Sequence, residues 1–141
     1  MSKEAIKELS LKDFLNKSID RSSKEKEEDQ IEIPGWGKIP VKRPTNDQTL
    51  DFLNAQANSV KFDKKGNITE TDLRVLTDSA VQYVYFACPY LQEPELQEAH
   101  EIKDPFDIPI KVFGIENVVD IANLIHEKFS GEKIRRSIKN S

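Results

Sequence analysis

The sequence has little of what several classes of protein need. Its 141 residues include one cysteine, Cys88, so no internal disulfide is expected, which fits a reducing compartment. Only five glycines occur, and they are scattered, so no glycine-rich phosphate loop is predicted. An excess of basic residues is also missing, since the net charge is -4. We therefore expect no nucleic-acid partner, because such a surface needs a basic face.

Long apolar runs are absent too. No stretch approaches the roughly 18 uninterrupted apolar residues of a membrane span, and residues 1–8 lack the apolar centre of a signal peptide. We therefore expect a cytoplasmic protein without a membrane partner. The length corresponds to one domain. With 37% hydrophobic and 33% charged residues, part of the chain is expected to lie outside the packed core.

The first predicted element is an amphipathic helix over residues 10–19. Ser10 and Asp13 have the spacing of a helix cap and an acid three residues on. One apolar face follows at helical spacing, made by Leu11, Phe14, Leu15 and Ile19. Residues 21–29 alternate in charge and contain no apolar side chain, which predicts a linker or a frayed extension of the helix. Residues 1–29 would then form a tethered arm, whose helix packs either on its own domain or on a partner.

Residues 30–42 predict a β-hairpin. Isoleucine and valine alternate with polar residues on either side of a Pro-Gly-Trp-Gly turn at residues 34–37. Trp36 in this turn has two interpretations. It packs as a lid on the helical body, which we favour because large aromatic side chains usually bury most of their area. Alternatively it is an exposed contact for a partner, because tryptophan is enriched in binding hot spots.

The rest of the chain predicts helices. Thr45 and Gln48 have capping-box spacing, and residues 60–68 look like a loop. The longest helix is expected to begin near Thr69 and to end at the residue before Pro89. A short helix follows over residues 94–101, then either two turns in series or a helix from Asp107. The last helix is predicted over residues 115–130, capped by Gly131.

These elements predict one fold class: mainly α with a small N-terminal β-hairpin (α+β). The globular domain would span residues 30–131 as a compact bundle of about four to five helices. The basic tail, residues 132–141, is expected to be disordered.

Three groups of residues resemble catalytic or metal sites, but their spacing or their surroundings do not fit such a site. The segment from Asp63 to Gly66 has two lysines where a calcium loop needs oxygen ligands. Cys88 belongs to the apolar face of a predicted buried helix, where a thiol behaves as a small hydrophobe rather than a nucleophile. His100 and His126 do not have zinc-ligand spacing. We therefore predict no catalytic residue, no metal and no cofactor, and a protein that is not an enzyme.

A resemblance covers roughly residues 10–130. The ordered strings Cys88-Pro89-Tyr90-Leu91, Glu95-Leu96-Gln97-Glu98-Ala99, Pro105-Phe106-Asp107-Ile108 and Lys111-Val112-Phe113 resemble the XkdN-like tail assembly chaperones of PBSX-type prophages. The opening Leu11-Lys12-Asp13-Phe14-Leu15 is similar to the N-terminal helix of that family. Pro109 departs from the pattern, because relatives usually have a residue there that can donate a backbone hydrogen bond.

The resemblance implies a chaperone that acts in the bacterial host cytoplasm. It would bind the long, helix-rich tape measure protein and help recruit tail tube subunits, and self-association would be compatible with this role. The candidate binding residues are Leu11, Phe14, Leu15, Ile19 and Trp36. An aromatic cluster comes second, with core packing favoured for most of its members: Tyr83, Tyr85, Phe86 and Tyr90. The alternative function is a structural virion component of the tail or baseplate, which would be expected to have more strands and long sheet edges.

Overall fold

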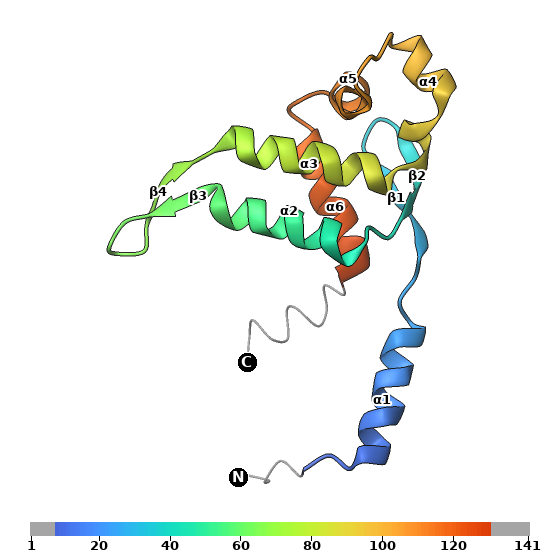
Figure 1. Cartoon of the computed structure of the whole chain (residues 1–141), viewed down its shortest axis with the longest axis vertical. Helices are drawn as coiled ribbons and strands as arrows, with labels where there is room; N and C mark the ends of the chain where they lie inside the picture. Colours follow the sequence, from blue (N-terminus) through green and yellow to red (C-terminus); the bar gives the residue numbers. More distant parts are fainter. Residues whose placement is uncertain (1–7, 131–141) are drawn as a thin grey trace.

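The computed structural model describes residues 8–130. Within them, five α-helices and a β-hairpin form a body, and a further helix, α1, lies apart from it, while a second hairpin projects from the opposite side (Figure 1). This arrangement confirms the predicted mainly helical α+β fold and the size of the bundle. The basic segment 132–141 and the predicted cap at Gly131 lie outside the described residues.

Helix α1 (Leu11–Ser23) begins where the sequence predicts. The Ser10 hydroxyl accepts a hydrogen bond from the backbone N–H of Asp13 at 3.1 Å. The helix continues past Ile19 to Ser23, so the first residues of the segment predicted as a linker or a frayed extension belong to the helix. Alternating charge at residues 20–25 favours this extension, because it places opposite charges four residues apart on one helical face. Two such ion pairs are present, Arg21–Glu25 and Asp20–Lys24.

The first hairpin consists of β1 (Glu28–Ile33) and β2 (Gly37–Lys42). It starts two residues earlier than predicted, because Glu28 pairs with Lys42 across the ladder. The predicted linker is therefore reduced to residues 24–27. Gly35 and Gly37 adopt φ values of 85° and 107° in and after the turn, a region that disfavours residues with a Cβ. Alternate side chains of the hairpin are buried in the core: Ile31, Ile33 and Val41.

Residues 60–68 were predicted to form a loop, which holds for the centre at residues 63–67 but is wrong for the flanks, residues 60–62 and 68. After α2 (Asn46–Asn58), the strands β3 (Val60–Phe62) and β4 (Ile68–Thr71) pair as a second antiparallel hairpin. The prediction failed because β3 has only three residues, which is too short for a clear alternating pattern. Gly66 makes the turn at a φ of 84°.

The longest helix, α3 (Leu73–Ala87), begins four residues after the predicted Thr69. Asp72 is its cap, since the Asp72 carboxylate accepts hydrogen bonds from the N–H groups of Arg74 and Val75 at 3.1 and 3.2 Å. Residues 68–71 are drawn into β4 instead, and the Asp72 N–H closes the hairpin on the Ser59 carbonyl. The helix ends before Pro89 as expected, and Cys88 is its C-cap.

The core lies where α3 meets α2 on one side and α6 (Val118–Ser130) on the other. The rings of Phe52 and Tyr83 stack with centroids 4.4 Å apart, and the His126 ring meets both edge-on at 6.1 and 6.4 Å. Full burial of a large apolar side chain contributes about 1.5–3 kcal/mol, so this contact is a main source of stability. Helix α6 begins three residues later than the predicted residue 115.

Two short helices, α4 (Pro94–Ala99) and α5 (Ile108–Phe113), close one end of the body (Figure 1). A 3-10 turn at Pro105–Asp107 leads directly into α5, so the structure combines both sequence alternatives for this segment. Pro109 lies in the first turn of α5, where a missing N–H has no helical partner to lose. Phe106 packs edge-to-face against Tyr85 and Phe86, with centroids 5.1 and 5.7 Å away.

Candidate partner-binding surfaces

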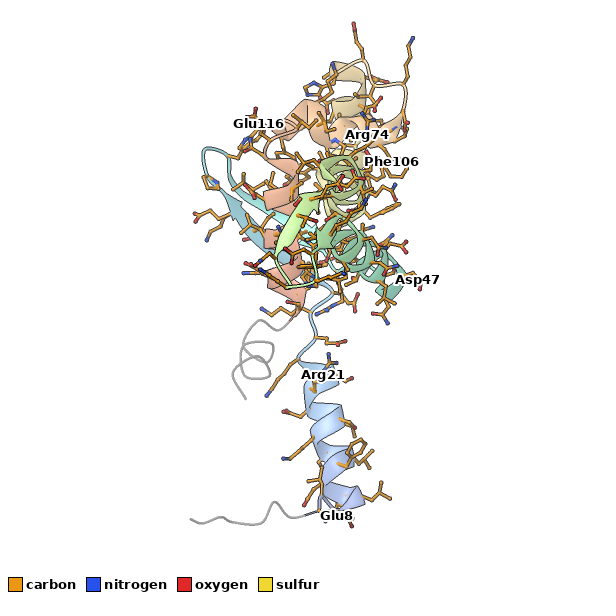
Figure 2. All side chains as sticks on the ribbon, turned by 90° about the vertical axis from the view of Figure 1, so that its left-hand side faces the viewer. Glu8, Arg21, Asp47, Arg74, Phe106 and Glu116 are labelled. Carbon is orange, nitrogen blue, oxygen red and sulfur yellow. The ribbon has the colours of Figure 1, made fainter. Side chains whose placement is uncertain are left out.

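The apolar stripe of α1 is the first candidate surface, and it is exposed along its whole length. None of the residues of α1 is buried, and α1 lies apart from the body in both views (Figures 1 and 2). The four predicted side chains are 82%, 61%, 53% and 59% exposed: Leu11, Phe14, Leu15 and Ile19. The sequence left open whether α1 packs on its own domain or on a partner. In the structure, α1 does not pack on its own domain.

Positive charges border this stripe, and negative charges lie behind it. At 3.6 residues per turn, Lys12 follows the stripe along the edge formed by Ile19, while Arg21 and Lys17 lie along the edge formed by Phe14. Asp13 and Asp20 fall on the opposite side of the helix. The stripe is therefore an apolar surface with basic borders, although the whole chain is acidic. Figure 2 shows Arg21 at the end of α1 that is nearer the body.

Arg43 fixes the junction between α1 and the body. Its Nε donates to the carbonyl of Lys26 at 2.8 Å, and its Nη1 donates to the carbonyl of Phe129 at 3.0 Å. The Arg43 guanidinium also lies over the Phe129 ring, 5.1 Å from the centroid. In addition, the Arg43 N–H donates to the Glu27 carbonyl at 2.7 Å. A single side chain thus joins the linker, β2 and the last turn of α6.

Ion pairs of Asp29 lie at the same junction. The Asp29 carboxylate lies 3.7 Å from Lys26 Nζ and 3.8 Å from Lys128 Nζ. A hydrogen bond from the Gln30 N–H to Asp29, together with the two ammonium groups, holds the pKa of Asp29 below its ordinary value. The Asp29 contacts therefore weaken as the pH falls through that lowered pKa.

The second candidate surface is a groove between the turn of the first hairpin and α6. Its volume is about 420 Å³, which is enough for a few side chains but not for a whole helix of 10–12 Å diameter. Its residues come from the hairpin, from α5, and from α6 with the loop before it. They are Ile33, Pro34, Trp36, Phe113, Asn117, Asp120, Ile121, Asn123, Leu124 and Glu127.

Trp36 forms one wall of this groove and combines both sequence interpretations. Its ring packs edge-on against Phe113 at 5.3 Å, with an interplanar angle of 66°, yet 59% of the residue stays exposed. Leu124 on α6 is also partly exposed, at 37%. Asp120 and Glu127 lie two helical turns apart on the same side of α6, so that edge of the groove is acidic. The groove is therefore apolar at its floor and negative along one edge.

The residues that imitate chemical sites have structural roles. Cys88 is fully buried, and burial raises the pKa of its thiol to about 12, which disfavours the thiolate that a nucleophile needs. The Asp63 carboxylate accepts hydrogen bonds from the N–H groups of Lys65 and Asn67 at 2.8 and 2.9 Å and thereby fixes the β3–β4 turn. These backbone bonds, led by that of Asn67, lower the Asp63 pKa. Over residues 8–130, no cluster of side chains has the composition of a metal site.

Sequence reasoning found the stripe and Trp36 but missed other exposed apolar side chains. In the second hairpin, Phe62 pairs with Ile68 across the ladder, and both are more than 60% exposed. A signal for this pair is present in the sequence: Val60 and Phe62 are apolar residues at alternate positions, and a turn with Gly66 follows them. The groove residues Phe113 and Leu124 carried no separate signal, because their helical spacing is the same as that of core residues. Of the predicted aromatic cluster, Tyr83 is buried and Tyr90 is exposed.

Comparison of the chain with protein-family models, with curated protein sequences and with solved structures found no match. None of the helices in the described part of the chain combines the length and apolar character needed to cross a bilayer.

Proposed function

We propose that this chain is a phage or prophage tail assembly chaperone that binds the tape measure protein in the bacterial host cytoplasm. The observation that carries the proposal is the apolar stripe of α1, which is held away from the body and exposed along its whole length. An isolated amphipathic helix of 13 residues is marginal in water. Its apolar side chains therefore favour a state in which another surface covers them.

Recognition would follow the helix-in-groove pattern, in which apolar side chains at three- and four-residue steps contact a complementary apolar face. A tape measure protein is long and rich in helices, so it offers many such faces. Such a protein associates with itself while its apolar faces are exposed. A small protein that covers those faces needs no catalytic residue. Help in recruiting tail tube subunits is a further part of the proposal and requires a second surface, for which Trp36 is the candidate.

The test is co-expression with the candidate tape measure protein, which we expect to be a long, helix-rich protein encoded by the next gene. We expect the long protein to stay in the supernatant and to co-purify with the wild-type chain. A variant with Phe14→Glu and Leu15→Glu should lose both effects, because two charges would interrupt the stripe. Leu50→Glu is the matched control, since Leu50 is equally exposed (61%) but lies on α2. If the long protein is equally insoluble with and without the wild-type chain, the proposal is wrong.

A further inference from the structure

We propose that the groove between Trp36 and Leu124 of one copy of this chain binds α1 of a second copy, so that two chains exchange their N-terminal helices. The proposal goes beyond the chaperone function and does not depend on it. The two contacts use the same stripe of α1, so an arm bound in the groove of a second copy is not available to the tape measure protein. It starts from two exposed surfaces of one molecule: an apolar stripe with basic borders and an apolar groove with an acidic edge. The apolar stripe of α1 is the helix, and the groove along α6 is its acceptor.

The two elements match in length. Helix α1 and helix α6 each contain 13 residues, and each is therefore about 20 Å long. If they lie side by side, Phe14 and Leu15 at the centre of the stripe can enter the groove. There they would cover Leu124 and the exposed part of Trp36. Four exposed apolar side chains, two from each surface, are then removed from water in one contact.

The charges also match. The basic edge of the stripe carries Lys17 and Arg21, while the acidic edge of the groove carries Asp120 and Glu127. When the stripe faces the groove, these edges meet, and the acids of α1 point away on the far side of the helix. Exposed ion pairs contribute little to affinity, but they select the partner and its orientation. The Arg21–Glu25 pair within the chain is exposed, so it competes only weakly with the new contact.

The geometry of the junction favours a second copy over the chain's own groove. Arg43 holds the carbonyls of Lys26 and Glu27, and α1 continues from there away from the body (Figure 1). Docking on its own groove would require the chain to reverse direction within residues 24–27 and to break these hydrogen bonds. A second copy can be reached with the junction intact. Exchange of an identical element between two chains then forms a closed, symmetric dimer.

The first experiment measures self-association of the full chain by sedimentation velocity over a range of concentrations. We expect the wild type to form dimers, and either Phe14→Glu on the stripe or Leu124→Glu in the groove to raise the dissociation constant at least tenfold. Leu50→Glu, the matched control on α2, should dimerise like the wild type. Circular dichroism melting checks that each variant is folded. A wild type that stays monomeric at every concentration would overturn the proposal.

The second experiment exchanges charges between the two edges. One variant carries Lys17→Glu and Arg21→Glu, so its arm and its groove are both acidic. The other carries Asp120→Lys and Glu127→Lys, so both are basic. Each variant alone should dimerise less than the wild type, whereas an equimolar mixture should form heterodimers, because each arm then meets a groove of opposite charge.

Two results of these experiments contradict arm exchange. If the mixture stays monomeric, the arm does not bind the groove of another chain. If the wild type dimerises and the groove variants, Leu124→Glu and the Asp120→Lys/Glu127→Lys pair, dimerise equally well, the arms pair with each other and the groove is not the acceptor. A control with all four charge substitutions in one chain should regain homodimers.

Discussion

Replacement of Arg43 by methionine should loosen the junction between α1 and the body and should also destabilise the body. Methionine keeps much of the apolar length of arginine but cannot donate the hydrogen bonds to the carbonyls of Lys26 and Phe129. It also removes the cation–π contact with the Phe129 ring. The backbone bond from residue 43 to the Glu27 carbonyl should persist, so β2 should still form.

The two effects can be estimated separately. A hydrogen bond from a charged donor contributes about 1.5–3 kcal/mol, and an exposed cation–π contact about 0.5–1 kcal/mol. Loss of the contacts with Phe129 should therefore lower the free energy of unfolding of the body by about 2 kcal/mol, at the low end because the junction is only partly buried. Loss of the bond to Lys26 acts on the linker. There, about 1.4 kcal/mol corresponds to a tenfold change in the equilibrium constant between the described orientation of α1 and other orientations.

Two measurements check these effects. Urea unfolding gives the change in stability, with Arg74→Met as the matched control at an exposed position on α3. Spin labels on Asn16→Cys and Lys61→Cys report the distance between α1 and the body, and the buried Cys88 should remain unlabelled. We expect a broader distance distribution for the Arg43 variant. If Arg43→Met and Arg74→Met unfold at the same urea concentration and have equally narrow distance distributions, Arg43 does not fix the junction.

Further predictions concern the body. Phe52→Ala should lower the free energy of unfolding by about 3–5 kcal/mol, because the Phe52 ring stacks on Tyr83. Leu50→Ala, at an exposed position, should lower it by about 0.5 kcal/mol or less. An equal loss in the two variants would contradict the described core. Because burial raises the Cys88 pKa to about 12 from 9.0, its contribution to stability is complete below pH 9.0 and should fall by about 1.4 kcal/mol per pH unit above it. Urea titrations should show a shallower decline for Cys88→Ala, and identical slopes would exclude this effect. Gly66→Ala should cost about 1 kcal/mol, because Gly66 has a φ of 84°; faster amide hydrogen exchange in the β3–β4 hairpin is the expected observation, and unchanged exchange would refute it.

Local signals in the sequence predicted the helices well where a cap defines the start. Ser10 and Thr45 each accept the expected backbone hydrogen bond, because a capping residue acts within three positions of itself. The prediction failed at the start of α3, where Asp72 and not Thr69 is the cap. Thr69 and Asp72 both precede the apolar positions of α3, and the pairing of β3 with β4 leaves only Asp72 free to cap. Such a pairing depends on contacts across a turn, which a cap pattern does not contain.

The candidate surfaces were predicted unequally for a similar reason. The stripe on α1 lies within one helix, so its spacing alone defines it. The groove joins the turn at Trp36 to Leu124, which lies almost ninety positions further on, and a helical pattern does not distinguish a groove residue from a core residue. The role of Arg43 was also hidden, because its acceptors are backbone carbonyls of Lys26 and Phe129, and any residue type provides those.

The contacts of Arg43 have a practical consequence for handling the protein. Since Arg43 binds both the linker before β1 and the last turn of α6, an affinity tag or a surface attachment at either of these places would crowd α1. The turn of the second hairpin, at Lys64 and Lys65, projects from the other side of the body (Figure 1). Attachment there, through a cysteine at Lys64, would leave both the stripe and the groove accessible in an immobilised sample.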